Sequence, residues 1–250
     1  MIYPFVLCAL ASFATGLGGI IVVLLGNTTV KTLSVFQGFA AGVMVTISFF
    51  EMLPNCYLNL LTEMTAEKAV IVTACIFMTG WFAAVLIGKI VDLVYGKKGE
   101  ITSSEKISLI TTSVMILHNL PEGMLTIFSG FADQHFALEM AVAVALHNIP
   151  EGVVVASGVL CITASRKKAV FQGFFAGLCE FIGGVAAVLV FGSLLSEIFL
   201  SAVLGVVSGV MVQTSLCQLM PDSARQSSKK HAISGFLLGV TVIYLGIFTI

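Results

Sequence analysis

The sequence predicts an all-α polytopic membrane protein with eight transmembrane helices, in a single domain that covers residues 1–250. Of its 250 residues, 58% are hydrophobic and only 10% are charged, and the mean hydropathy is +1.08. About a quarter of the residues in a soluble domain are charged. Eight apolar runs each reach the length of about 20 residues that a transmembrane helix needs. The loops between these runs differ sharply in basic charge, which is typical of membrane proteins.

Each expected helix ends at a short polar break. The first four, 3–25, 33–55, 69–95 and 107–130, are followed in turn by G-N-T-T at 26–29, the charged stretch 62–68, the basic stretch 96–106 and the polar stretch 132–135. The last four, 137–160, 168–195, 198–220 and 232–250, are separated by breaks at 165–168, 196–197 and 223–231. The break at 196–197 is the shortest. No remaining stretch is long enough for a soluble domain.

The placement of Lys and Arg supports eight spans. With that number, the first, third, fifth and seventh loops lie on one side of the membrane and carry ten basic residues, whereas the opposite loops carry only Lys68. Basic residues concentrate on the cytoplasmic side. We therefore expect a multi-pass protein of the cell membrane with both termini outside the cytoplasm. The ten residues are Lys31, Lys97, Lys98, Lys106, Arg166, Lys167, Lys168, Arg225, Lys229 and Lys230.

Parts of the sequence repeat. The letters G-V-M-V occur at 42–45 and again at 209–212, and both copies are followed by a Ser and a Pro at the same spacing, with an offset of 167 residues. Spans one to three therefore match spans six to eight, around a central pair formed by spans four and five. Five spans separate each matched pair, so the copies run in opposite directions, as in many secondary transporters. The alternative is chance recurrence of small-residue packing motifs.

The central pair of spans carries the motif H-N-x-P-E-G twice, at 118–123 and at 147–152. Residues four apart share one face of a helix. His118 and Glu122 on one helix, and His147 and Glu151 on the next, therefore direct an imidazole and a carboxylate to one point. The intervening proline disturbs the helical hydrogen bonds, which is tolerated at membrane depth only inside protein or beside a polar cavity.

Further polar residues lie in neighbouring spans. Asn119 and Asn148 point about 100° away from the histidines and could form an adjacent site through their amide oxygens. Glu180 lies inside the sixth span, and Glu51 lies in the last turns of the second, on the same span as Met44.

The intramembrane carboxylates indicate a metal. An ionised carboxylate near the bilayer centre costs about 2.5–3.5 kcal/mol on insertion scales, and no Lys or Arg lies at the depth of Glu51, Glu122, Glu151 and Glu180. Divalent cations would balance this charge, and His, Glu and Asn together suit Zn²⁺, Fe²⁺ or Mn²⁺.

Plainer interpretations remain for several of these residues. A single intramembrane His or Glu is often only hydrogen-bonded packing, Glu180 could be protonated, and Met44 could simply fill the core. His135, His231 and Glu139 are interpreted as ordinary solvated or interfacial residues.

These motifs resemble the ZIP (Zrt-, Irt-like protein) family of divalent-metal transporters, in particular its ZupT-type branch. The resemblance covers the whole chain: the eight spans, the paired motif, Glu180, and the pattern A-A-G-V-M … S-F-F-E-M-L-P at 40–54. It implies a binuclear site at mid-membrane, in which His118, Glu122, His147 and Glu151 form one metal site. It implies a second site formed by Asn119, Asn148 and Glu180, with Glu122 and Glu151 bridging the two.

The resemblance also implies roles beyond the site. Met44 and Glu51 would line the path of the metal, and spans one, four, five and six would move as a bundle against two, three, seven and eight. Many family members are homodimers, so a homodimer is a candidate assembly. Two differences stand out: the loop 96–106 lacks the histidines of many relatives, and Cys217-Gln218 replaces acids that ZupT-type relatives often carry. The roles of that loop and of those acids are therefore open here.

The function expected from these features is transport of Zn²⁺, and of Fe²⁺, Mn²⁺ or Cd²⁺, into the cytoplasm, without catalytic residues and with the metal as cargo and not as a cofactor. A selective metal channel is an alternative that the sequence does not separate from a carrier. An intramembrane metalloprotease is disfavoured, because zincins require H-E-x-x-H and Asn follows the His in both motifs. A nucleic-acid partner is excluded by 12 Lys and Arg against 13 Asp and Glu.

Overall fold

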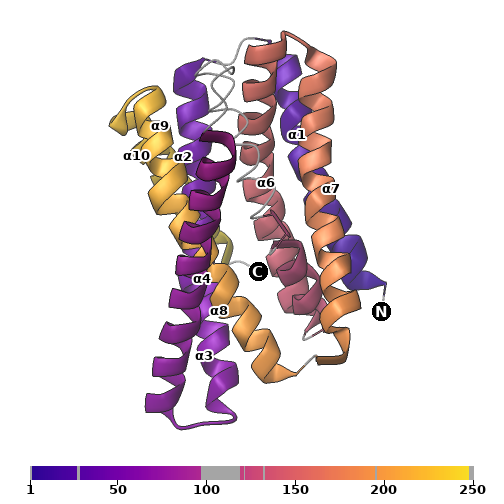
Figure 1. Cartoon of the computed structure of the whole chain (residues 1–250), viewed down its shortest axis with the longest axis vertical. Helices are drawn as coiled ribbons and strands as arrows, with labels where there is room; N and C mark the ends of the chain where they lie inside the picture. The colour runs from indigo at the N-terminus through magenta and orange to yellow at the C-terminus, as the bar shows by residue number, and fades with distance from the viewer. Residues whose placement is uncertain are drawn as a thin grey trace.

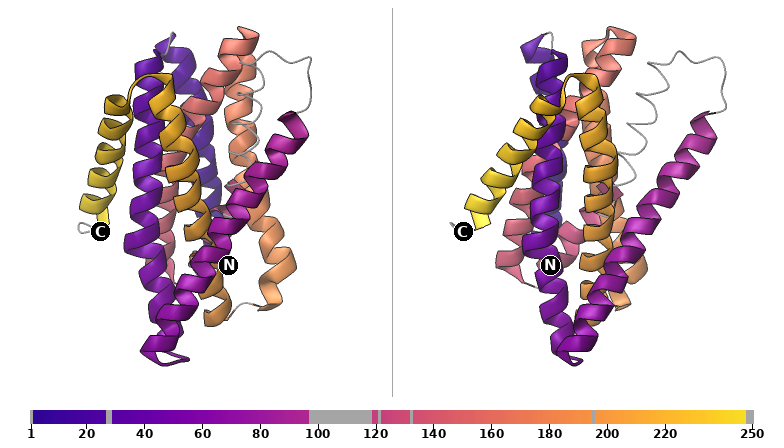
Figure 2. Two further views of the ribbon diagram at one scale, coloured as in Figure 1. Left: turned by 60° about the vertical axis from the view of Figure 1, so that its left-hand side comes forward. Right: turned by 90° about the vertical axis from the view of Figure 1, so that its left-hand side faces the viewer.

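The chain folds into long helices that run side by side (Figures 1 and 2). The structure is a computed structural model, and it describes residues 2–26, 29–96, 119–120, 122–131, 133–194 and 196–247. Within these ranges there are helices and turns but no strand. The helices are α1 (Tyr3–Leu25), α2 (Val30–Ile47), α3 (Leu53–Leu61), α4 (Ala66–Gly96), α6 (Gln134–Thr163), α7 (Arg166–Phe191), α8 (Glu197–Thr214), α9 (Met220–Gln226) and α10 (Lys229–Ile247). Residues 119–120 and 122–131 are also helical.

Six of the described helical segments are long and apolar enough to cross a membrane. They are Tyr3–Leu25, Val30–Leu61, Ala66–Ile90, Gln134–Leu160, Arg166–Phe191 and Ile198–Arg225. The prediction of an all-helical, polytopic membrane protein is thereby confirmed. Helix α10 covers most of the eighth expected span, and much of the fourth, 107–130, lies outside the described residues. The total of eight spans stays a prediction.

The outer surface of the helices is apolar. Ile71 and Phe82 on α4 are each 62% exposed, and Leu189 on α7 is 82% exposed. Large apolar side chains at this density on the outside of a soluble protein would be an aggregation hazard. In a membrane, the same side chains contact lipid.

The polar breaks act as helix N-caps. A side-chain oxygen at the N-cap accepts a hydrogen bond from a backbone N–H that the helix itself leaves without a partner. Thr29, Asp133, Ser165 and Ser196 each accept such a bond from the N–H three residues later, at the starts of α2, α6, α7 and α8. The short break at 196–197 therefore does separate two helices.

The two ends of the helix bundle differ in charge. The turns from α1 to α2, from α6 to α7 and from α9 to α10 lie at one end, and those from α3 to α4 and from α7 to α8 lie at the other (Figure 1). Among the described residues, the first end carries seven of the ten basic loop residues, from Lys31 to Lys230. The second carries Lys68 together with the acidic residues Glu63, Glu67 and Asp133. We call these the basic end and the acidic end.

The helices associate in two groups. The first helix group consists of α1, the helical residues 119–131 that are described, α6 and α7; the second consists of α2, α3, α4, α8, α9 and α10. Helices α2 and α6 pack against each other and join the groups.

Glycines bring the helices of each group into direct main-chain contact. A Cβ atom at Gly18 would overlap the main chain of Ile149, and one at Gly152 would overlap Thr15, so α1 and α6 can approach this closely only because both residues are glycine. In the second group, a Cβ atom at Gly42 would overlap the main chain of Phe236. Every described glycine that closely approaches another helix does so within its own group. At the boundary between the groups, the aromatic rings of Phe128 and Phe199 pack against each other with centroids 5.7 Å apart.

Two short π-helices interrupt long helices at equivalent positions. They are Ser48–Met52 after α2 and Ser215–Leu219 after α8. The N–H of Ser48 donates to the carbonyls four and three residues earlier, and the N–H of Ser215 does the same. Helices α2 and α8 run in opposite directions (Figure 1). This local similarity accords with the repeat offset of 167 residues, while the full inverted repeat of spans one to three and six to eight stays a prediction.

Candidate metal site

Three ligand-type side chains converge in the interior of the first helix group. Glu122 lies on the helical segment 122–131, and His147 and Glu151 lie one turn apart on α6. One ligand atom from each of the three lies within 4.8 Å of the other two. All three residues are at most 1% exposed. The spacing of the sequence motif therefore produces the predicted convergence in space.

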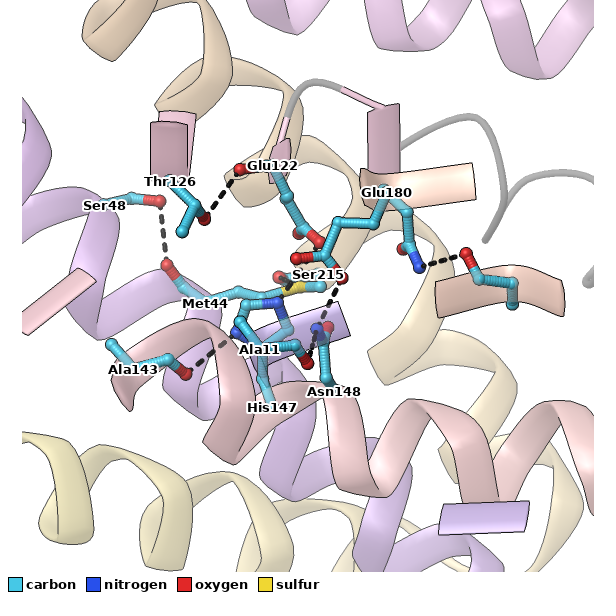
Figure 3. A network of polar contacts seen from close by, with 12 residues as sticks. Ala11, Met44, Ser48, Glu122, Thr126, Ala143, His147, Asn148, Glu180 and Ser215 are labelled. Atoms are coloured by element: carbon cyan, nitrogen blue, oxygen red, sulfur yellow. Dashed lines mark hydrogen bonds and ion pairs between the residues drawn. The ribbon is translucent and has the colours of Figure 1, made fainter. Parts of the chain in front are cut away.

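His147 has a polar contact on each side of its ring. Its Nδ1 lies 3.2 Å from the carbonyl oxygen of Ala143, one turn earlier on α6, and its Nε2 lies 3.3 Å from Oε2 of Glu122 (Figure 3). With the proton on Nδ1, that nitrogen donates to the carbonyl and Nε2 presents its lone pair to the cluster. This is the arrangement of most metal-binding histidines.

A second set of polar groups lies beside this cluster. Asn148 Nδ2 donates to Oε2 of Glu180 on α7 at 2.7 Å and to the carbonyl of Ala11 on α1 at 2.9 Å (Figure 3). Asn119 Nδ2 is 3.5 Å from the carbonyl of Ala176. Both amide nitrogens are thus used by the protein. The buried Oδ1 atoms of Asn119 and Asn148 have no hydrogen-bond partner among the described residues, which leaves two oxygens of a type that metal ions accept.

The charge of the site lacks a protein cation. Glu180 is fully buried and close enough to Glu122 and Glu151 to repel them. Among the described residues no Lys or Arg is buried. Buried carboxylates need a proton or a cation to balance them, and the mixed nitrogen and oxygen ligands suit a divalent transition metal.

Met44 and Glu51 occupy different positions. Met44 of α2 is fully buried; its Sδ accepts a hydrogen bond from Ser215 Oγ at 3.2 Å, and its carbonyl accepts one from Ser48 Oγ at 2.8 Å (Figure 3). Glu51 is half-buried in the first π-helix and is not part of the three-residue cluster. It lines a cavity of about 830 Å³ instead. His118, the remaining predicted ligand, lies outside the described residues.

Some residues at the site were not predicted from the sequence. Ser12 of α1, 5% exposed, hydrogen-bonds to Glu180, and nothing in the pattern of α1 marked it. Ser215 contacts Met44; its position was visible in the repeat, but its role was not.

Comparison with known proteins agrees with this geometry. The sequence model of the family described as ZIP Zinc transporter matches residues 96–247. The chain is 32% identical to a zinc transporter ZupT of Chlorobium phaeovibrioides, over 98% of this chain and 97% of that protein. It is 33% identical to a ZupT of Salmonella heidelberg, over 99% and 96%, and 31% identical to one of Streptococcus mutans, over 96% and 94%. With near-complete coverage and the paired motif at the centre of the fold, the chain belongs to the ZIP zinc transporter family, whose members are membrane transporters and not enzymes.

Proposed function

We propose that this protein carries Zn²⁺, and with it Fe²⁺, Mn²⁺ or Cd²⁺, across the cell membrane into the cytoplasm through the buried site. The observation that carries the proposal is the cluster of Glu122, His147 and Glu151, whose ligand atoms lie within 4.8 Å of one another in the interior. Mixed His and Glu ligation suits a transported ion, because the ion must leave as well as bind.

The proposed site is binuclear. His118, Glu122, His147 and Glu151 would hold one ion, and Asn119, Asn148 and Glu180 would hold the second, with Glu122 and Glu151 shared. Support comes from the nearness of Glu180 to both shared carboxylates and from the two amide oxygens without partners in the described part of the chain. Two divalent ions would offset four buried or half-buried carboxylates, Glu51 included.

Movement of one helix group against the other is the proposed transport step. All the described candidate ligands except Glu51 and Met44 come from the first helix group. Glycine contacts hold each group together internally and are absent from the boundary between them among the described residues. The ion can therefore travel with the first group while Met44 and Glu51 remain on the second. A selective channel is the second candidate mechanism.

We also propose that the basic end lies in the cytoplasm, since Lys and Arg concentrate there, so that both termini face outward. The apolar outer surface fits a lipid bilayer, and a homodimer remains a candidate assembly.

The test is uptake by reconstituted liposomes. We expect saturable entry of radioactive Zn²⁺, with Fe²⁺, Mn²⁺ and Cd²⁺ as competitors, and its loss in the variant Glu122→Gln/Glu151→Gln, which preserves side-chain volume. The control Glu63→Gln removes an exposed carboxylate on the α3–α4 turn and should transport normally. Equal uptake by the native protein and the double variant would contradict the proposal. Preloading with unlabelled Zn²⁺ separates the mechanisms when the membrane potential is clamped at zero, because a carrier then gives a transient overshoot of labelled ion and a channel does not.

A further inference from the structure

Helix α6 carries a second His-x₃-Glu pair besides the one in the buried site. His135 and Glu139 lie in its first two turns, twelve residues before His147 and Glu151. At 1.5 Å per residue this places the two pairs about 18 Å apart along the helix. Nδ1 of His135 lies 3.2 Å from Oε1 of Glu139. The same spacing that brings an imidazole and a carboxylate together in the interior therefore does so again near the acidic end.

This outer pair lines the cavity of about 830 Å³ that also contains Glu51. The cavity lies between the two helix groups: His135 and Glu139 come from the first, and Glu51 and Asn55 come from the second. Its lining includes Asn59 at the end of α3 and Ser196 at the start of α8, so it reaches the acidic end of the molecule. We call it the vestibule.

The vestibule has a negative lining. Glu51, Asp133 and Glu139 contribute carboxylates, and no Lys or Arg is among the described lining residues. Asp133 already accepts a hydrogen bond from the N–H of Phe136 as a helix N-cap. It therefore contributes negative charge to the vestibule, and we do not count it among the metal ligands. Glu51 and Glu139 interact electrostatically across the cavity. Clefts lined by one sign of charge raise the local concentration of the counter-ion.

Negative charge alone would attract any cation, but the imidazole of His135 favours particular metal ions. A His and a carboxylate held at i and i+4 can both bind one ion, and imidazole favours transition metals over Ca²⁺ or Mg²⁺. The inner end of the vestibule is lined by Leu125, one helical turn from Glu122. The cavity therefore extends from the acidic end to within one helical turn of a candidate ligand of the buried site.

We propose that His135 and Glu139, facing Glu51, form a capture site that binds a divalent transition metal in the vestibule before it enters the buried site. That the ion binds here before it reaches the buried site rests on the proposed direction of transport. Metal binding in the vestibule does not depend on that direction. The sequence alone assigned His135 and Glu139 to ordinary solvated and interfacial positions. The cavity that they line, and the residues of the second helix group that face them across it, change that interpretation.

Direct binding tests the capture site independently of transport. In the purified variant Glu122→Gln/Glu151→Gln, equilibrium dialysis with Cd²⁺ should still detect bound metal. Adding His135→Asn/Glu139→Gln should weaken that binding on the order of tenfold. Adding Glu63→Gln/Glu67→Gln, which removes two exposed carboxylates at the same end but outside the vestibule, should leave it unchanged.

Uptake supplies the second readout. With the buried site intact, His135→Asn/Glu139→Gln should raise the half-saturating Zn²⁺ concentration on the order of tenfold and leave the maximal rate unaltered. The capture site is refuted if Cd²⁺ binding and half-saturation are both unaffected, or if the Glu63→Gln/Glu67→Gln control has the same effect. If the native protein does not transport Zn²⁺ but the vestibule still binds metal, the proposed function is wrong and the capture site is supported.

Discussion

Asn148 connects three helices at the buried site through a single amide group. Its Nδ2 donates both to the Glu180 carboxylate on α7 and to the carbonyl of Ala11 on α1. Because both donor hydrogens are used there, the amide is fixed in one orientation and its oxygen points elsewhere. The residue thus holds the carboxylate in place and offers an oxygen on its other side, which only Asn or Gln can do.

Replacement of this amide by a carboxylate tests that role. Asn148→Asp puts a second acidic group 2.7 Å from Glu180 and removes the donor to Ala11. Breaking a buried charged interaction costs about 3 kcal/mol or more, so the metal-free variant should be less stable by about that amount. Zn²⁺ should restore much of the loss, since the new carboxylate is a better ligand than an amide. Thermal unfolding in detergent, with and without Zn²⁺, measures both effects.

Asn119→Asp is the matched control for that variant. The Asn119 amide makes one long contact, 3.5 Å to the Ala176 carbonyl, and donates no hydrogen bond to a carboxylate among the described residues. Its replacement should therefore destabilise the metal-free protein less. Equal melting temperatures for native protein and Asn148→Asp without metal would show that Glu180 does not depend on this bond.

At the scale of helices, the spans were more predictable than their irregularities. Apolar length and polar breaks located α1, α4, α6 and α7 to within a few residues, because lipid leaves few alternatives to a helix. The π-helices at Ser48–Met52 and Ser215–Leu219 were not predicted, since a π-helix depends on packing around it and has no reliable sequence signal. Glu51 belongs to the first of them and lines the vestibule, outside the central cluster.

The functional residues, like the helices, were predictable from the sequence only in part. His147 and Glu151, four residues apart on α6, lie close to each other and to Glu122. His135 and Glu139 have the same spacing, but the sequence led to their interpretation as ordinary solvated or interfacial residues. The facing wall of their cavity comes from α3 and α8, which are distant in sequence. Contacts between distant segments are what a single sequence conveys least well.

The contact between α1 and α6 depends on glycine. A methyl group at Gly152 would overlap the main chain of Thr15, and main-chain atoms cannot move aside as a flexible side chain can. Gly152→Ala should therefore destabilise the protein by about 1–3 kcal/mol or separate the helices. Thermal unfolding in detergent measures the change.

Gly88→Ala serves as the comparison. Its added Cβ would lie 3.7 Å from Nε2 of Gln218, an ordinary contact, and Ala is the better helix former by about 1 kcal/mol. Its stability should be equal to or above that of the native protein. If Gly152→Ala were as stable as Gly88→Ala, close packing would not hold the first helix group together.

At the scale of the whole molecule, the candidate ligands are distributed unevenly. Glu122, His147, Asn148, Glu151 and Glu180 all belong to the first helix group, as do Ser12 and Ala11, which bond to them. Met44 and Ser215 of the second group are next to each other in a separate contact. Metal binding would therefore link helices that are already packed closely together and would leave the second group almost unaffected.

Hydrogen exchange can detect this asymmetry. A ligand at 100 times its dissociation constant stabilises the state that binds it by about 2.7 kcal/mol, and the stabilisation appears as slower amide exchange in the helices that supply the ligands. Zn²⁺ should slow exchange in residues 122–131, α6 and α7, and leave α4 and α10 unchanged. In the variant Glu122→Gln/Glu151→Gln, Zn²⁺ should no longer slow exchange in residues 122–131 and α7, and any remaining protection should be confined to the vestibule. Equal protection of both groups would mean that metal binding joins them, and an ion that joins the two groups could not be carried by one moving against the other.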